Sequence, residues 1–195
     1  AGVDLSVYEN EGDKKLSYLK KRLTLAHSLA TDYYQQSLLK NEHALEYVFK
    51  KRQLNKAVVR DFKIGYAPSA GDALVNFLIK KGFSKTELSQ AGLVNRFGGD
   101  LFRGRIIIPL MDHSGQTIGF TGRAIHDDPK SPKYLNTSQT VIYDKSRHVF
   151  GLSQAKESIR SNDYAVVVEG NLDVVSSHQV DIKQESSFSI ISRII

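Results

Sequence analysis

Two acidic residues, Glu169 and Asp173, form the strongest chemical signal in the sequence. They lie in Val166-Val-Val-Glu-Gly-Asn-Leu-Asp173, where a β-branched run leads into a glycine. This run predicts a buried strand that ends at Glu169, and Gly170 permits a sharp turn into a helix from Leu172 onward. Both carboxylates would then lie at the carboxyl edge of an α/β sheet and share a hard cation such as Mg²⁺. The other interpretation is a purely structural turn in which Asp173 favours the helix N-terminus.

Basic residues in the middle of the chain have the chemistry needed to hold phosphates. Arg123 ends a predicted strand after small residues that let a ligand come close, and its guanidinium can grip a phosphate with two hydrogen bonds. Lys133 and Tyr134 follow Pro132 and pair an ammonium with an aromatic face, a combination suited to a single strand. Lys145 lies in the next loop. For each cation taken alone, a solvated surface charge is the more common explanation.

The elements that must position these residues follow from hydrophobic periodicity. Apolar residues recur every three or four positions from Lys15 to Leu39, which predicts one long amphipathic helix. After two adjacent glycines the pattern changes, and the segments Arg105–Met111 and Gln116–Ala124 read as strands of a hairpin. Further helices are predicted over residues 43–51, 55–62, 71–81, 84–91 and 153–160, and a further strand over residues 165–169.

Composition restricts the class of protein without identifying it. The 195 residues carry 27 basic and 21 acidic side chains, and the net charge of +6 suits a polyanionic partner. The chain has no cysteine, which excludes disulfides and any zinc ribbon within it. No apolar stretch is long enough to span a bilayer, and the start Ala1-Gly-Val-Asp lacks a signal-peptide pattern. We therefore expect a cytoplasmic protein that does not associate with a membrane.

Five sequence blocks follow one another along the chain: Phe62–Pro68, Phe102–Pro109, Ile118–Ala124, Pro132–Asn136, and Lys145 together with Phe150–Leu152. Together they resemble the catalytic core of bacterial replicative primases of the DnaG type, and they follow the order of that family. The resemblance covers residues 1 to about 183. It implies that Glu169-Gly-x-x-Asp173 opens a Toprim domain, the metal-binding module that primases share with topoisomerases.

The resemblance implies an α+β fold with a helical front half and a small antiparallel sheet, followed by the first strand-helix unit of a Toprim α/β domain. Residues 1–161 would form the template-binding N-terminal domain of the catalytic core. Residues 162–195 would form the truncated start of the Toprim domain. We therefore expect the boundary between the two domains at Ser161 and Asn162.

The resemblance also implies an activity and its partners. The family reaction is template-directed synthesis of an RNA primer on single-stranded DNA from ribonucleoside triphosphates, with Mg²⁺ or Mn²⁺ as cofactor and no zinc in this chain. Glu169 would serve as metal ligand or base, and Asp173 would support it. A replicative helicase would be the partner of the full-length protein, and the location would be cytoplasmic and nucleoid-associated.

Residues at the positions of Arg123, Lys133, Tyr134 and Lys145 line the basic groove of the family that contacts template and nucleotide. Arg52 matches an arginine assigned to template binding, although Gln53 replaces the glycine that follows it in the family. Arg103 and Arg105 flank Gly104, and strand alternation would put both on one face. There they would either face the groove or pair with acidic neighbours.

The sequence also departs from the family pattern. It contains no later Asp-x-Asp pair, the family's zinc domain is missing, and Ala1-Gly-Val resembles the end of its linker. Residues 185–195 fit neither the next strand of the family nor a polar terminus, and this apolar tail would need burial. We therefore expect this chain alone to bind template with little or no polymerase activity. The alternatives are a different Toprim enzyme, nuclease-like or topoisomerase-like, and a nonenzymatic module that binds single-stranded DNA.

Overall fold

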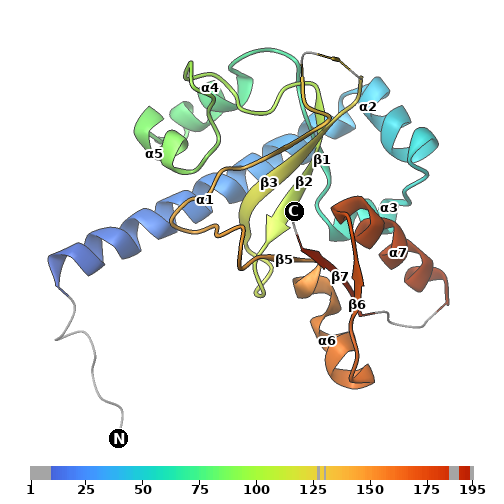
Figure 1. Cartoon of the computed structure of the whole chain (residues 1–195). Coiled ribbons are helices and arrows are strands. Elements are labelled where there is room, and N and C mark those ends of the chain that lie inside the picture. Colours follow the sequence, from blue (N-terminus) through green and yellow to red (C-terminus); the bar gives the residue numbers. More distant parts are fainter. Residues whose placement is uncertain (1–9, 127, 130, 185–188, 194–195) are drawn as a thin grey trace, which may run out of the picture.

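The computed structural model describes residues 10–126, 128–129, 131–184 and 189–193 (Figure 1). The beginning of the chain, including the linker-like Ala1-Gly-Val, lies outside this range. The elements in chain order are α1 (Glu11–Leu39), α2 (Glu42–Glu46), the π-helix η2 (Tyr47–Lys51), α3 (Lys56–Asp61), β1 (Gly65–Ala67), α4 (Ala73–Lys80), α5 (Lys85–Gln90), β2 (Arg105–Met111), β3 (Thr117–Ala124), β4 (Tyr134–Asn136), β5 (Val149–Phe150), α6 (Leu152–Asn162), β6 (Val166–Val168), α7 (Asn171–Gln184) and β7 (Ile190–Arg193).

The long front helix is confirmed as α1, and it begins four residues earlier than predicted. Asn10 caps it, because its side-chain oxygen accepts a hydrogen bond from the Asp13 backbone N–H at 2.9 Å. The apolar stripe then runs down one face of the helix. Its buried members pack against the sheet, and they include Leu23, Ala26, Ala30, Tyr34 and Leu38.

A four-stranded antiparallel sheet in the order β1-β2-β3-β4 forms the centre of the molecule. The predicted hairpin is confirmed as β2 and β3, and the register pairs Ile108 with Thr121 and Ile106 with Arg123. Strand β1 was not predicted, because it begins at Gly65 and is followed by Pro68, and both residues read as breaks. Strand β4 was not predicted either, so the sheet has two strands more than the pattern indicated.

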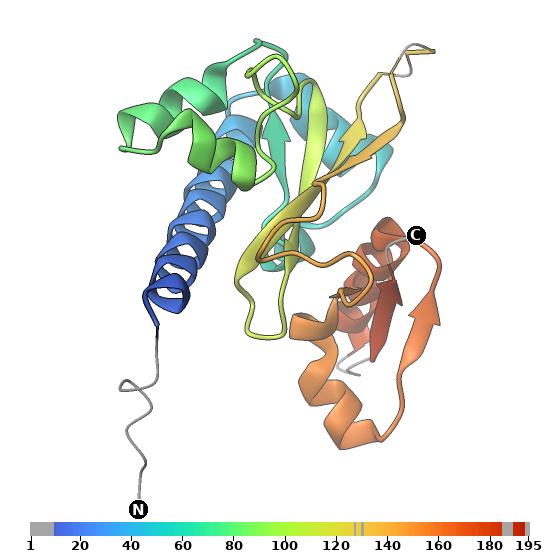
Figure 2. The ribbon, with the colours of Figure 1, turned by 60° about the vertical axis from the view of Figure 1, so that its left-hand side comes forward.

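Both faces of this sheet are buried, and alternate residues face different layers. Ile107 and Phe120 belong to a core cluster with α1, α4 and α5. Ile106 and Ile108 belong to a second cluster, which includes α2, η2, α3 and the C-terminal segment. Figures 1 and 2 show the helices on either side of the sheet. The position of a residue along its strand therefore decides which layer its side chain joins.

A second sheet in the order β5-β7-β6 lies below the first and carries α6 and α7 (Figure 2). The tail was expected to fit neither the next strand of the family nor a polar terminus, and its residues 190–193 do form a strand, β7, between β5 and β6. Residues 185–188 and 194–195 lie outside the described residues. Ile190 is buried within the chain's own core, so this part of the tail needs no other molecule to cover it.

Strand β6 differs from the prediction in its surroundings. It was expected to be buried, but it forms an edge of its sheet, and the side chain of Val167 is 69% exposed. The helix predicted from Leu172 follows the Gly170 turn and begins one residue earlier, at Asn171. The predicted domain division at residues 161–162 falls in the last turn of α6 and remains a prediction. The predicted α+β class, with a helical front half and a small antiparallel sheet, is confirmed.

The predicted helix over residues 43–51 is present, but its geometry changes from α-helical to π-helical partway along. It is α-helical from Glu42 to Glu46 and π-helical from Tyr47 to Lys51. Asn55 caps α3 as predicted, since its side chain accepts a hydrogen bond from the Val58 N–H at 2.8 Å.

No helix within the described residues has the length and apolar character that crossing a membrane requires.

The close contact between β1 and α1 at Gly65 gives a stability prediction. A Cβ added to Gly65 would lie 2.6 Å from the backbone carbonyl carbon of Tyr34, so the helix and strand would have to separate. We expect Gly65→Ala to lower the free energy of unfolding by about 1–3 kcal/mol in urea titrations. Gly71→Ala is the control, because the nearest atom to its Cβ would be the mobile end of Arg103 at 3.7 Å. Equal stabilities of the two variants would contradict this account.

An ion pair between α1 and α5 gives a pH prediction. The Arg22 Nε atom lies 2.6 Å from Glu87 Oε1, and the hydrogen bond from Arg22 holds the pKa of Glu87 at about 2, below its ordinary 4.5. Because the folded-state pKa is lowered, the pair stabilises the fold above pH 4.5 and this stabilisation is lost as the pH falls toward 2.

We expect Glu87→Gln to cost about 1 kcal/mol at neutral pH, since the pair is partly exposed to solvent. In urea titrations, the difference in free energy of unfolding between Glu87→Gln and the unmodified chain should shrink as the pH falls from 4.5 toward 2. Glu157→Gln removes a carboxylate from the exposed Arg160–Glu157 pair and is the matched control. A difference between Glu87→Gln and the unmodified chain that stays constant with pH would refute the role of the ion pair.

Candidate functional site

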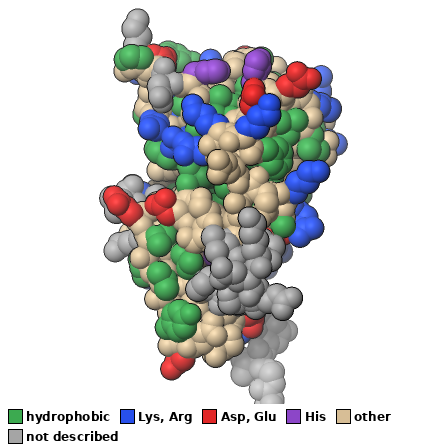
Figure 3. Space-filling model, turned by 90° about the vertical axis from the view of Figure 1, so that its right-hand side faces the viewer, with side chains coloured by type: hydrophobic (Ala, Val, Ile, Leu, Met, Phe, Trp, Pro, Cys, Tyr) green, Lys and Arg blue, Asp and Glu red, His purple; other side chains and the backbone are tan. Residues whose placement is uncertain are grey.

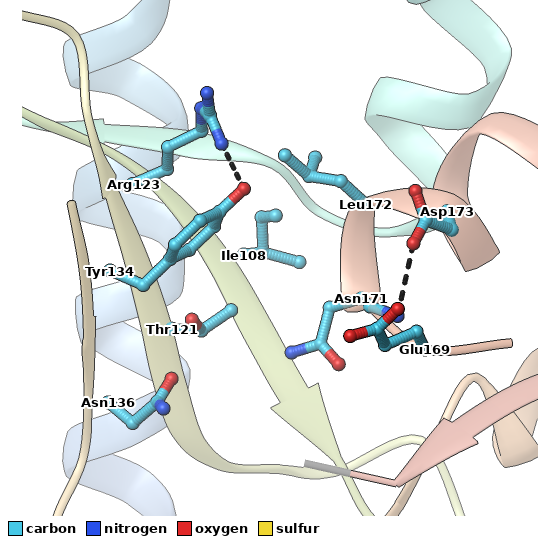
Figure 4. Close-up of a pocket in the computed structure, with 10 residues that line it drawn as sticks. Ile108, Thr121, Arg123, Tyr134, Asn136, Glu169, Asn171, Leu172 and Asp173 are labelled. Carbon is cyan, nitrogen blue, oxygen red and sulfur yellow. Dashed lines mark hydrogen bonds between the residues drawn. The ribbon is translucent and has the colours of Figure 1, made fainter. Parts of the chain in front are cut away.

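A pocket of about 440 Å³ lies between the β3–β4 edge of the large sheet and the start of α7 (Figure 4). It brings together parts of the sequence some fifty residues apart. Arg123 and Tyr134 come from the sheet side, whereas Glu169 comes from the turn after β6 and Asp173 from the first turn of α7 (Figure 4). The other residues that line it are Ile108, Thr121, Asn136, Gly170, Asn171 and Leu172.

The acidic edge of the pocket has the local geometry that the sequence predicted. Glu169 and Asp173 are both exposed, and the Gly170 N–H donates a hydrogen bond to Asp173 Oδ2 at 3.1 Å. One oxygen of Asp173 thus caps α7, as the structural interpretation requires, while both carboxylates still line the pocket. The described residues contain no group of three His, Cys, Asp or Glu side chains that could hold a metal ion.

The small C-terminal sheet supports this acidic edge. Asn171, the first residue of α7, lines the pocket, and its Oδ1 atom accepts a hydrogen bond from the Ser192 hydroxyl at 3.1 Å. Ser192 is buried in β7. The tail strand therefore fixes the side chain of a pocket residue.

The basic edge is built around Arg123 at the end of β3. Its Nε atom donates to the Tyr47 hydroxyl at 2.6 Å, and its Nη1 atom donates to the Tyr134 hydroxyl. The guanidinium carbon also lies 4.9 Å from the centre of the Tyr134 ring. Two phenols therefore hold the guanidinium at the pocket, and neither of them neutralises its charge.

Tyr47 is a residue that the sequence analysis missed. Its hydroxyl accepts hydrogen bonds from Arg52 Nε at 3.2 Å and Nη2 at 3.0 Å as well as from Arg123. Burial favours a raised pKa for Tyr47, but the hydrogen bonds from Arg123 and Arg52 outweigh it and the net pKa is lowered. Arg52 follows Tyr47 by five residues, and the π-helical turn between them brings the two side chains to the same side of the helix.

Arg103 and Arg105 do not share a strand face, so that expectation is wrong. Gly104 has a φ of +58°, and β2 begins only at Arg105. Arg105 is buried, which lowers its pKa, and its guanidinium donates to the backbone oxygens of Gly122, Pro132 and Lys133 and to the Ser131 hydroxyl. These bonds hold in place the segment that leads into β4. The Nε atom of Arg103 donates to the Asp100 carbonyl, outside the pocket.

Lys133 and Lys145, the other predicted phosphate ligands, are exposed and do not line the pocket. Lys133 immediately precedes β4, whose alternation points Tyr134 and Asn136 into the pocket. The structure thus places Arg123, Tyr134, Glu169 and Asp173 around one pocket and links Arg52 to Arg123 through Tyr47. Arg103, Lys133 and Lys145 do not line the pocket.

Thr121 and Asn136 also line the pocket and were not predicted to do so. They are register partners in the β3–β4 pair, each two residues from a predicted ligand. The period of two along a strand would have placed Thr121 beside Arg123 and Asn136 beside Tyr134. The pairing of β4 with β3 could not be read from the sequence, because a loop of irregular composition separates them.

The charges of the pocket are divided between its two sides. Among the described residues neither Arg52 nor Arg123 makes an ion pair, and Figure 3 shows Lys and Arg side chains gathered on the upper half of one face. Unpaired guanidiniums beside hydroxyl and amide groups are suited to phosphate oxygens. The carboxylates on the opposite side are oxygen ligands of the type that Mg²⁺ prefers.

Comparison with known proteins agrees with this geometry. The family described as the DNA primase catalytic core, N-terminal domain, matches residues 33–156. A DNA primase from Synechocystis sp. is 37% identical over 184 residues, which are 90% of this chain and 28% of that protein. A DNA primase from Aquifex aeolicus is 42% identical over 147 residues, which are 74% of this chain and 29% of that protein.

Solved structures give the same result. The RNA polymerase domain of Mycobacterium tuberculosis primase DnaG superposes with a TM-score of 0.78 at 34% identity and covers 89% of this chain and 56% of that one. A DnaG primase catalytic domain bound to single-stranded DNA also has a TM-score of 0.78, at 31% identity, with 92% of this chain and 55% of that one covered. This chain therefore spans little more than a quarter of the curated relatives and about half of these structures. It belongs to the family of bacterial DnaG-type DNA primases.

Proposed function

We propose that this chain is the template-binding part of a primase catalytic core, together with the start of a Toprim domain. The whole protein would synthesise RNA primers on single-stranded DNA from ribonucleoside triphosphates during DNA replication. The observation that carries this proposal is the pocket in which Arg123 and Tyr134 face Glu169 and Asp173. A polymerase needs such a place, where cationic groups hold phosphates beside ligands for a metal ion.

The basic edge supports a nucleic-acid partner. Within the described residues the Arg52 and Arg123 guanidinium groups make no ion pair, and Tyr134 is 46% exposed and offers its ring for stacking. Solved structures of relatives in this family contain single-stranded and double-stranded DNA. We propose that Arg52, Arg123 and Tyr134 contact the template or nucleotide directly, that Lys133 and Lys145 contribute at the margin, and that Arg103 contacts DNA outside the pocket. For Arg105 we propose a positioning role, since its donors are engaged by the chain itself.

Glu169 and Asp173 fit Mg²⁺ or Mn²⁺ by ligand type but not by number. Mg²⁺ demands near-octahedral coordination, and two carboxylates, one of them engaged by the Gly170 N–H, leave most positions to water. When bound by a full set of ligands, the metal supplies the charge that stabilises a transferring phosphoryl group. We therefore propose that this chain binds template but makes little or no primer by itself.

For the whole protein we propose a replicative helicase as partner and a cytoplasmic, nucleoid-associated location, as the family resemblance implies. The alternative of a nuclease-like or topoisomerase-like Toprim enzyme has less support, because the relatives found are DNA primases. A nonenzymatic module that binds single-stranded DNA would share the basic edge with the proposed function. Metal-dependent primer synthesis by the whole protein distinguishes the two.

We expect the chain to bind a single-stranded oligonucleotide with an affinity that falls as salt rises, because cations displace counterions from the phosphates. Arg123→Ala should weaken binding about tenfold or more in fluorescence anisotropy, since it removes a guanidinium and its stacking on Tyr134. Arg160→Ala is the control, as Arg160 lies exposed on α6 and is paired with Glu157. Binding that is insensitive to Arg123→Ala would refute the proposed site.

We expect no primer from this chain with ribonucleotides and either Mg²⁺ or Mn²⁺ on a single-stranded template, because its carboxylates are too few to hold the metal. Products would be measured by gel electrophoresis, with Glu169→Gln as the comparison. Products that disappear in Glu169→Gln would show a working metal site and contradict this prediction. Absent products with retained DNA binding would support a template-binding role.

A further inference from the structure

We propose that a groove beside Tyr47, lined by Lys50 and Lys51 of the π-helix, holds backbone phosphates of the same single strand that passes Arg123. This inference rests on the proposed function and extends it to a second binding site. The groove encloses about 440 Å³, and its other lining residues are His43, Glu46, Ile125 and His126. None of its residues except Tyr47 belongs to the site described above or was singled out as a ligand.

The groove and the first pocket are joined through one side chain and one strand. Tyr47 lines the groove, and its hydroxyl accepts the hydrogen bond from Arg123, which lines the pocket. Ile125 and His126 of the groove follow directly on β3, the strand that carries Arg123. A strand of nucleic acid that leaves the pocket at Arg123 therefore reaches the groove without crossing another element.

Three cations of the described residues converge on Tyr47. The Lys51 ammonium and the Arg52 guanidinium each lie 5.4 Å from the centre of the Tyr47 ring, and Arg123 donates to its hydroxyl. Within the described residues none of these three makes an ion pair. Like charges gathered in this way repel one another, so a bound anion lowers the energy of the cluster.

The π-helical turn explains why the cations lie together. In an α-helix, residues five apart point to different sides, whereas the wider π turn brings Tyr47 and Arg52 onto one side. Lys50 and Lys51 are exposed at the same turn, and π turns are frequent at functional sites. Among the described residues that line the groove, Glu46 is the one carboxylate, and its Oε1 atom lies 3.1 Å from the Lys50 ammonium in a solvent-exposed pair.

Phosphate could reach the groove from a nucleic-acid strand or from a free nucleotide. The groove favours the strand, because its imidazoles and the Ile125 side chain offer contacts along its length rather than one enclosed phosphate cradle. The test therefore includes both sources.

The test measures binding of the 195-residue chain to a labelled single-stranded DNA of about 16 nucleotides over a range of salt concentrations. Lys50→Gln/Lys51→Gln should weaken binding about three- to tenfold at low salt and reduce the slope of log K against log salt by about 1.4, equivalent to two phosphate contacts. Lys50→Arg/Lys51→Arg should keep the slope, since charge is retained. Glu46→Gln should raise affinity about twofold, because it removes the opposing charge.

The matched control is Lys80→Gln/Lys85→Gln, which removes two exposed lysines from α4 and α5. If the two double variants lose the same affinity and slope while Arg123→Ala weakens binding, the groove inference fails and the proposed function stands. If the unmodified chain binds no oligonucleotide, both fail. ATP is the second ligand: weaker ATP binding with unchanged oligonucleotide binding in Lys50→Gln/Lys51→Gln would assign the groove to a nucleotide and overturn the inference.

Discussion

The burial of both faces of the four-stranded sheet is the constraint on which the candidate site depends. Because successive residues of a strand point to opposite faces, the register that buries Ile107 against α1 also directs Ile108 toward the pocket. The same alternation sends Thr121 and Arg123 to the pocket side. A slip of one residue would exchange both sets and bury the guanidinium against α1, so packing of the core and placement of the site are one requirement.

Local signals were sufficient for the elements but not for their partners. The helix cap at Asn55 and the hairpin turn at residues 112–115 can each be predicted from a few neighbouring residues, and the structure confirms both. Strand β7 could not be read in this way, because residues 190–193 gain their place only by pairing with β5 and β6. Burial of β6 was overestimated for the related reason that a β-branched run does not reveal how many strands flank it.

The basic residues illustrate the limit of reading a site from residue types. Arg105 begins β2 and Arg123 lies near the end of β3. The sequence around each arginine does not reveal whether its guanidinium is buried or open to a ligand. Backbone carbonyls of the 131–134 segment surround the first, while two phenols hold the second at an open pocket. The different surroundings of the two guanidiniums depend on which segment of the chain packs against the end of each strand. Tyr47 was missed for a similar reason, since its role depends on a π turn that periodicity does not report.

The division of charge across the pocket separates binding from chemistry. A phosphate bound at Arg123 would lie on the side opposite Glu169 and Asp173, and those carboxylates would repel it unless a cation lay between them. The basic side would need no such ion, because Arg52 and Arg123 make no ion pair within the described residues and Tyr47 and Tyr134 fix the Arg123 guanidinium. The acidic side, in contrast, depends on α7, on the Gly170 turn and on Ser192 of β7. Under the proposed function, affinity for a polyanion would therefore reside in the residues before 150, whereas metal-dependent chemistry would require more ligands than Glu169 and Asp173 supply.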